Sequence, residues 1–169
     1  MQFFSLAQCV GYVALVLGVT AFRQKDDRRL KLFLAAECAA YTVHFSLLGK
    51  LTAALSTGTS GARCLIALKT QSRWVAALML AINLLIGACF ARSLLGWLPV
   101  VSSCLGTIAV FLLQGITMRL VLLSSTLLWL GNNLACGSIG GTVLETLIAL
   151  SNLSTIIRLW RPARLEADV

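Results

Sequence analysis

The residues best suited to chemistry lie inside apolar segments, where ionisable side chains are unusual. Glu37, Tyr41 and His44 follow one another at i, i+4 and i+7, which places them on one face of a helix. A charged side chain at the centre of a bilayer costs roughly 2.5–3.5 kcal/mol, so such positions are candidates for function. The stripe is suited to binding a polar ligand or carrying protons. Alternatively, its groups form interhelical hydrogen bonds that only hold a bundle together.

A second stripe with the same spacing occurs later in the chain, at Ser125, Trp129 and Asn132. Amide and imidazole groups facing lipid would leave donors unsatisfied, so both stripes are predicted to face the protein interior. We therefore expect Tyr41, His44, Trp129 and Asn132 to approach one another across a central cavity. Aromatic faces beside polar groups predict a binding site for a small polar ligand.

Three further polar residues interrupt apolar segments. Arg63 follows a run of serine and threonine residues, and Glu145 and Asn152 lie seven residues apart on one helix face. A buried guanidinium needs a partner, and Glu145 or Glu37 would supply a carboxylate for it. Such a pair would serve the structure or bind substrate, and the sequence leaves both interpretations open.

The sequence contains no recognisable catalytic or metal-binding set. His44 is the single histidine and has no acidic residue at hydrogen-bonding spacing, and no HExxH or nucleophile-elbow pattern occurs. The six cysteines form no CxxC pair, and we interpret them as small packing residues between helices. We therefore expect no metal, no cofactor and no enzymatic activity.

The composition decides the class of protein. Apolar residues make up 59% of the 169-residue chain and charged residues only 12%, about half the usual charged share of a soluble domain. Mean hydropathy is +0.90. Soluble enzymes, secreted disulfide-rich proteins and disordered chains are excluded. The partner is therefore the lipid bilayer. The net charge of +8 is attributed to membrane topology and not to nucleic-acid binding.

The apolar segments predict an all-α, polytopic membrane protein with seven transmembrane helices. A bilayer core of about 30 Å requires about 20 apolar residues per helix. A short, charged and frayed cytoplasmic tail is expected at 160–169. The predicted spans are 3–22, 30–48, 51–68, 74–91, 97–113, 118–136 and 139–159.

Lysine and arginine residues predict the orientation. Eleven fall on one side of the predicted helices and two, Lys50 and Arg92, on the other. Because cytoplasmic loops carry the excess of basic residues, we expect a periplasmic N-terminus and a cytoplasmic C-terminus. The eleven are Arg23, Lys25, Arg28, Arg29, Lys31, Lys69, Arg73, Arg119, Arg158, Arg161 and Arg164.

The chain also repeats itself weakly. A shift of 88 residues places Gly49 on Gly137 and aligns loops and polar positions in one register. This predicts two three-helix bundles, 3–70 and 97–159, joined by a linker helix at 74–91. Many transporters are built from such repeats and bind substrate between them. The alternative is chance similarity between hydrophobic helices. The same shift pairs Gly18 with Gly106, Tyr41 with Trp129 and His44 with Asn132.

Several motifs carry a family resemblance. They are Tyr41 and the segments FRQKDDRRLK (22–31), HFSLLG (44–49), WLGNN (129–133) and GSIGGT (137–142). Over nearly the whole chain, the sequence resembles the YgjV-type family of bacterial inner-membrane proteins. The resemblance implies a location in the bacterial inner membrane but no particular activity.

A more distant likeness is to the SWEET and PQ-loop transporters, which join two three-helix bundles through one linker helix. Asn152 resembles the substrate-binding asparagine of that group, but its counterpart at the 88-residue shift is Cys64. The Pro-Gln hinge is absent, because Val100 follows Pro99. The leading hypothesis is a transporter of small polar solutes. The alternative is a membrane assembly or regulatory protein that transports nothing, and the sequence leaves the substrate and oligomeric state open.

Overall fold

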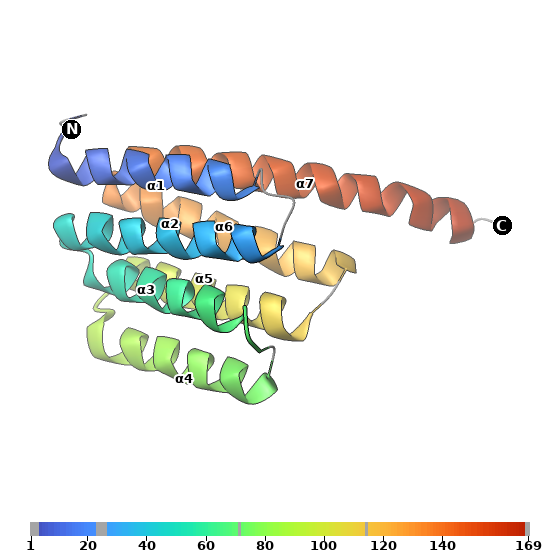
Figure 1. Cartoon of the computed structure of the whole chain (residues 1–169), viewed down its shortest axis with the longest axis horizontal. Helices are drawn as coiled ribbons and strands as arrows, with labels where there is room; N and C mark the ends of the chain where they lie inside the picture. Colours follow the sequence, from blue (N-terminus) through green and yellow to red (C-terminus); the bar gives the residue numbers. More distant parts are fainter. Residues whose placement is uncertain (1–3, 23–26, 71, 114, 168–169) are drawn as a thin grey trace.

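The computed structural model describes residues 4–22, 27–70, 72–113 and 115–167. In these residues the regular structure is entirely helical (Figure 1). The predictions of an all-α fold and of seven helical segments are confirmed. The helices are α1 (Leu6–Phe22), α2 (Asp27–Leu47), α3 (Leu51–Ile66), α4 (Arg73–Phe90), α5 (Leu94–Leu112), α6 (Gly115–Cys136) and α7 (Ile139–Ala167).

The last helix continues past residue 159, where the sequence analysis ended it. Helix α7 continues through Pro162 and ends at Ala167. The last described residues are alanine, arginine, leucine and glutamate, all of which have high helix propensity. In Figure 1 this end of α7 extends beyond the other helices.

Six of the helices form a closed ring, and each packs against its two neighbours in the ring. Going round the ring, the order is α1, α2, α3, α5, α6 and α7, and α7 packs back onto α1. Helix α4 lies outside the ring, against α3 and α5. Figure 1 shows α4 at one edge of the molecule, with all helices running along one common direction. Around the ring, α1, α2 and α3 therefore follow one another in the same sense as α5, α6 and α7.

Two similar turns connect neighbouring helices at one end of the bundle. Gly49 (φ +68°) follows α2 and Gly137 (φ +68°) follows α6. After Gly49, the amide of Lys50 donates to the Phe45 carbonyl at 2.8 Å, and after Gly137 the amide of Ser138 donates to the Asn133 carbonyl at 2.9 Å. This is the Schellman arrangement, in which glycine adopts the left-handed conformation without a Cβ penalty. We call this end of the bundle the glycine-turn end.

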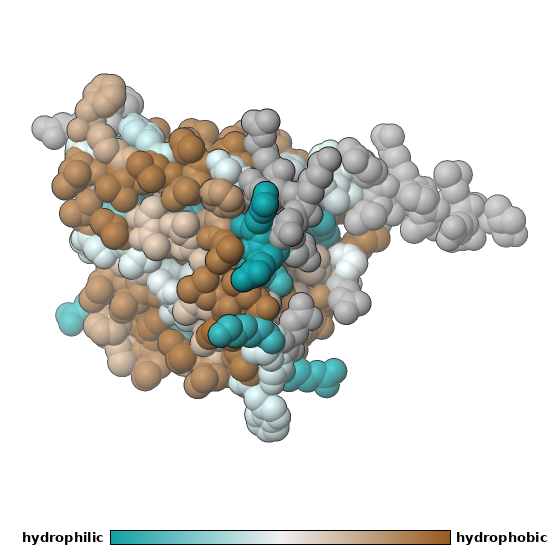
Figure 2. Space-filling model, viewed as in Figure 1, coloured by the Kyte–Doolittle hydropathy of each residue, from teal (hydrophilic) through white to brown (hydrophobic). Residues whose placement is uncertain are grey.

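The surface and the interior have the composition expected in lipid. Large apolar side chains of every helix lie exposed, and many buried side chains are small or polar. Figure 2 shows hydrophobic residues covering much of the visible face. By length and composition, α4, α5 and Ile139–Ile157 of α7 are able to cross a membrane, and Leu6–Ala21 of α1 is a shorter apolar helix. Helices α2, α3 and α6 are less apolar, because α2 begins with the charged residues Asp27, Arg28, Arg29 and Lys31 while α3 and α6 carry buried serine, threonine and asparagine residues.

The described basic residues separate between the two ends of the bundle. Lys50 and Arg92 lie in turns at the glycine-turn end. The remaining described lysines and arginines outside α3 lie at or near the other end, which we call the basic end. There the Lys31 ammonium donates to the Ala67 carbonyl at 3.1 Å and joins α2 to α3. The members are Arg28, Arg29, Lys31, Lys69, Arg73 and Arg119, together with Arg158, Arg161 and Arg164 in the last turns of α7.

Candidate functional site

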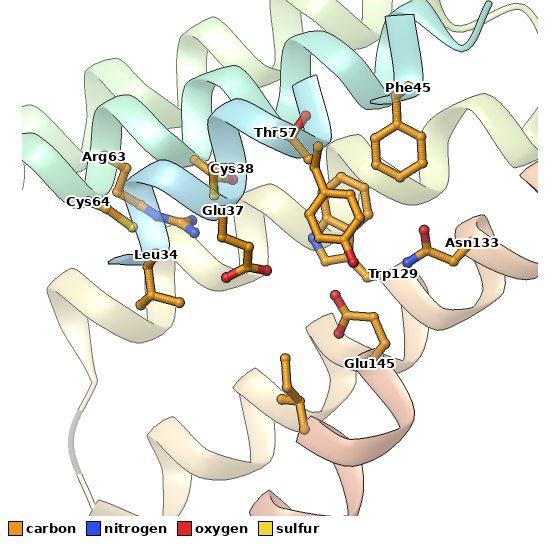
Figure 3. A pocket seen from close by; sticks show the side chains of 13 residues that line it. Leu34, Glu37, Cys38, Phe45, Thr57, Arg63, Cys64, Trp129, Asn133 and Glu145 are labelled. Carbon is orange, nitrogen blue, oxygen red and sulfur yellow. The ribbon is translucent and has the colours of Figure 1, made fainter. Parts of the chain in front are cut away.

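A cavity of about 150 Å³ lies inside the ring, between α2 and α3 on one side and α6 and α7 on the other (Figure 3). Along α2 its lining runs from Leu34 to Phe45, which corresponds to about 16 Å of helix. The cavity therefore extends through much of the bundle's length. The lining residues are Leu34, Glu37, Cys38, Tyr41, Phe45, Thr57, Ser60, Arg63, Cys64, Trp129, Asn133, Glu145 and Ile148.

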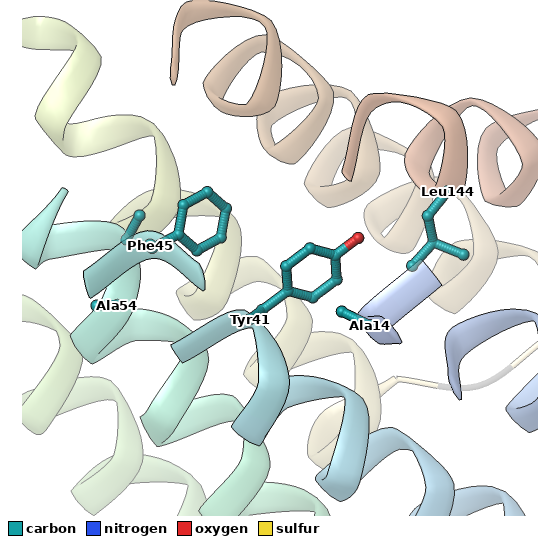
Figure 4. Close-up of a cluster of buried hydrophobic side chains, with 6 residues drawn as sticks. Ala14, Tyr41, Phe45, Ala54 and Leu144 are labelled. Atoms are coloured by element: carbon teal, nitrogen blue, oxygen red, sulfur yellow. The ribbon is translucent and has the colours of Figure 1, made fainter. Parts of the chain in front are cut away.

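Three aromatic rings form a continuous stack beside the cavity, which we call the aromatic wall. Tyr41 stacks on Phe45, with ring centroids 5.7 Å apart and an interplanar angle of 23°. Phe45 stacks in turn on Trp129 at 6.0 Å and 20°. Tyr41 and Phe45 also belong to a buried apolar cluster with Ala14 and Leu144 (Figure 4). This packing fixes the rings that line the cavity.

The Tyr41 side chain contributes an unusual polar atom to the aromatic wall. Only 6% of Tyr41 is exposed, and its hydroxyl oxygen has no hydrogen-bond partner in the described part of the chain. Figure 4 shows the ring extending from α2 with its hydroxyl on the side of Leu144 of α7. A buried hydroxyl without a partner is costly, so this group is available to a ligand.

All three intramembrane charges predicted from the sequence line the cavity. Glu37 comes from α2, Arg63 from α3 and Glu145 from α7. Figure 3 shows both carboxylates pointing into the space between these helices. If all three groups are ionised, the cavity carries one excess negative charge.

We expected Arg63 to pair with a carboxylate, but in the described residues it forms hydrogen bonds with α5 instead. One guanidinium nitrogen, Nη1, donates to the Ser103 carbonyl at 3.0 Å and to the Thr107 hydroxyl at 3.1 Å, both on α5. Gly106 leaves room for the guanidinium, since a Cβ at that position would lie 2.9 Å from Nη1. The charge of Arg63 is thus anchored to α5, and α3 is joined to α5 through it.

The prediction that His44 lines the central cavity is wrong. Its ring is fully buried, and Nδ1 lies 2.6 Å from the Ala7 carbonyl of α1 while Nε2 lies 2.8 Å from the Ser138 hydroxyl. Gly11 of α1 packs directly on the ring. His44 therefore joins α1, α2 and the α6–α7 turn, which is the structural role that the sequence left open.

Gln8 completes this connection, and the sequence analysis did not single it out. Its amide donates to the Gly137 carbonyl at 2.6 Å and accepts from the Ile139 amide at 3.2 Å. The available signal was a glutamine one helical turn before Gly11 in an otherwise apolar segment. Near this level α1 and α7 meet closely, because a Cβ on Gly140 would lie 2.5 Å from the Gly11 carbonyl oxygen.

Two predicted asparagines also lie away from the cavity. Asn132 is buried, and its carbonyl oxygen accepts from the Cys136 thiol at 3.7 Å. Asn152 donates to the Arg119 carbonyl at 3.0 Å and joins α7 to α6. Asn133 lines the cavity instead, with 2% of its surface exposed. Trp129 of the predicted stripe lines the cavity. Asn132, the last residue of that stripe, does not, and the adjacent Asn133 lines the cavity in its place.

Cysteines contribute to one wall. Cys38 of α2 and Cys64 of α3 line the cavity. In the described residues, no group of three or more histidine, cysteine, aspartate or glutamate side chains is placed to hold a metal ion. Cys38 also packs against Gly61 of α3, where a Cβ would come within 3.1 Å of it.

The structure defines a helical membrane protein with an apolar exterior and a polar, charged cavity between its helices. The chain belongs to the YgjV family: the family model described as a bacterial inner membrane protein matches residues 5–163. It is 40% identical over 168 residues to the inner membrane protein YgjV of Escherichia coli K12, covering 99% of this chain and 92% of the relative. No solved structure matches the chain, so the SWEET likeness gains no support from known structures.

Proposed function

We propose that this protein transports small polar solutes across the bacterial inner membrane and that the cavity between α2, α3, α6 and α7 is the binding site. The observation that carries the proposal is a cavity lined by charged and polar groups inside an otherwise lipid-adapted bundle. Polar groups at membrane depth are kept where they serve a pathway or a ligand. The proposed role is binding and translocation, without catalysis.

A 3+1+3 architecture is part of this proposal, with α1–α3 and α5–α7 as repeats and α4 as the linker. The ring supports it, because a rotation by 180° about the axis of the ring places α1 on α5 and α3 on α7. After this rotation, each of the six ring helices again lies between equivalent neighbours. The glycine turns support it as well, since Gly49 and Gly137 follow the second helix of each triplet with the same φ. The cavity then lies between the repeats, where transporters of this design bind substrate.

The two ends of the cavity differ in a way that suits alternating access. Toward the glycine-turn end, the bonds of His44 and Gln8 hold α1, α2 and α7 together. Toward the basic end, the lining continues to Leu34 and Cys64. With the N-terminus periplasmic and the C-terminus cytoplasmic, as the basic residues favour, the closed end is the outer one.

The alternative function, an assembly or regulatory protein without transport, is favoured by the number of polar contacts that only join helices. Ser102 and Ser125 exchange hydrogen bonds of 2.7 and 2.9 Å with each other's carbonyls and join α5 to α6. Ser60 and Ser103 join α3 to α5 at 3.0 Å. Such contacts explain many buried polar groups but leave the charged cavity unexplained.

Thermal stability of the purified protein in detergent tests the proposal. A panel of cationic, anionic and neutral metabolites of roughly the size of benzene or slightly larger fits a cavity of this size, because an engineered cavity of about 150 Å³ holds benzene. At least one solute is expected to raise the melting temperature and to enter proteoliposomes containing the protein. Trp129→Ala and Asn133→Ala should abolish the shift, whereas the adjacent Asn132→Ala should retain it. A panel without any stabilising solute would refute the proposal.

A further inference from the structure

We propose that the cavity binds a small organic cation, with its ammonium group beside Glu145 and its apolar part against the aromatic wall of Tyr41, Phe45 and Trp129. This inference rests on the proposed function, because it names the class of solute that the same site accepts. It follows from the cavity's charge, from the placement of Arg63, from the aromatic wall and from one buried hydroxyl group.

When both carboxyl groups are ionised, the charge of the cavity favours a positive occupant. Glu37 and Glu145 supply two carboxylates and Arg63 supplies one guanidinium, and all three line the same space. No ion pair joins Arg63 to either carboxylate in the described structure, where its Nη1 donors go to Ser103 and Thr107 of α5. A buried carboxylate without a counter-ion is strongly destabilising. A cationic ligand would supply the missing positive charge.

The position of the charges indicates which carboxylate receives the ligand. Arg63 is held on the α5 side of α3 by its two hydrogen bonds and by the space that Gly106 leaves. Glu145 lies on α7, which is not a ring neighbour of α3. Its carboxylate is therefore the one farther from the fixed positive charge in the ring, and it faces the cavity in Figure 3.

The aromatic wall provides the second half of a cation site. Its three rings stack with centroid distances of 5.7 and 6.0 Å, so that they form one extended surface from α2 to α6. The faces of tryptophan and tyrosine rings attract cations, and aromatic surroundings are a recurrent means of binding quaternary ammonium groups. A neutral or anionic solute would gain the apolar contact with the rings but not the cation–π attraction.

Tyr41 gives an independent indication that a polar ligand is expected here. It lines the cavity, only 6% of it is exposed, and its hydroxyl has no partner in the described residues. A ligand that carries a hydroxyl or ammonium donor would satisfy this oxygen. The cavity volume of about 150 Å³ limits such a ligand to roughly the size of benzene or slightly more.

Isosteric probes that differ in charge test the inference on the full-length protein in detergent. The cations are choline, tetramethylammonium and n-butylammonium. The controls are 3,3-dimethyl-1-butanol, the neutral carbon analogue of choline, and 3,3-dimethylbutyrate, a similar anion. Isothermal titration and thermal shifts should show binding of at least one cation and of neither control. Equal binding of choline and its neutral analogue would overturn the inference.

Two variants connect the binding to the named groups. Glu145→Gln preserves the shape of the side chain and should weaken cation binding by about tenfold or more, as expected when a charged partner is lost. Trp129→Leu should weaken it by about fivefold through loss of the ring face. Ser124→Ala, an exposed position on α6, should leave binding unchanged. If Glu145→Gln does not fold, Trp129→Leu still decides the outcome.

The remaining outcomes separate this inference from the proposed function. If an anion or a neutral solute binds and Trp129→Leu or Asn133→Ala removes that binding, the cavity is a solute site but its ligand is not a cation. If no solute of any charge binds, the proposed function fails together with the inference. If cations bind equally to Glu145→Gln and to the unsubstituted protein, Glu145 is not the cation's partner and the inference is wrong.

Discussion

Replacing Gly140 by alanine tests whether α1 and α7 close the ring. A Cβ on Gly140 would lie 2.5 Å from the Gly11 carbonyl oxygen and 2.8 Å from its carbonyl carbon. Ordinary contact begins near 3.4 Å, so the two backbones must separate by about 0.9 Å. Overpacking of this kind costs about 1–3 kcal/mol, and the gain of up to about 1 kcal/mol in helix propensity does not offset it. We expect a net loss of about 1–2 kcal/mol.

Gly58→Ala is the matched control, because a Cβ there would meet only the Thr42 side chain, at ordinary distances of 3.6 Å from the hydroxyl and 3.9 Å from the methyl group. It should leave the free energy of unfolding unchanged or raise it by up to about 1 kcal/mol. Reversible unfolding in mixed detergent micelles, followed by circular dichroism, measures both variants. A Gly140→Ala protein as stable as Gly58→Ala would show that α1 and α7 do not meet at Gly11, and the ring would have to be redrawn.

Two other predictions concern the packing at the glycine-turn end and the orientation of the bundle in the membrane. His44→Ala removes hydrogen bonds of 2.6 and 2.8 Å and should lower the free energy of unfolding by about 2 kcal/mol. In a double-mutant cycle with Ser138→Ala, purely additive losses would contradict the hydrogen bond between the His44 ring and the Ser138 hydroxyl. Lys50→Cys should react with a membrane-impermeant thiol reagent in intact cells, and Lys69→Cys only after permeabilisation, each relative to the unsubstituted chain. The reverse pattern would invert the topology.

The helices were predictable because each of them is indicated by its own run of apolar residues. Each of the seven expected spans overlaps an observed helix, and the glycines that end α2 and α6 were visible in the repeat. Their positive φ angles give a physical reason for the shared position of Gly49 and Gly137. The end of α7 was mispredicted because the charge of that segment suggested a solvated tail, whereas its helix propensity governs.

The candidate site was only partly predictable, because the spacing of polar residues shows which residues share a helix face but not which neighbouring helix or cavity that face meets. The cost of burying charge correctly placed Glu37, Arg63 and Glu145 toward the interior. Asn132 and Asn133 are adjacent and differ by about 100° around α6. Both are buried, and the neighbouring helices decide which of them faces the cavity. That choice depends on helix crossing, for which the sequence carries no direct signal.

Glu37 and His44 illustrate how packing divides one stripe between two roles. At the level of His44, Gly11 and Gly140 let α1 and α7 approach so closely that the imidazole is enclosed and bonded on both nitrogens. Two turns closer to the start of α2, Glu37 packs against Gly18 of α1, where a Cβ would lie 3.1 Å from its carboxyl carbon, and it also lines the cavity. The close contact of Gly11 with Gly140 therefore holds α1 against α7 at the glycine-turn end, where His44 has a structural role.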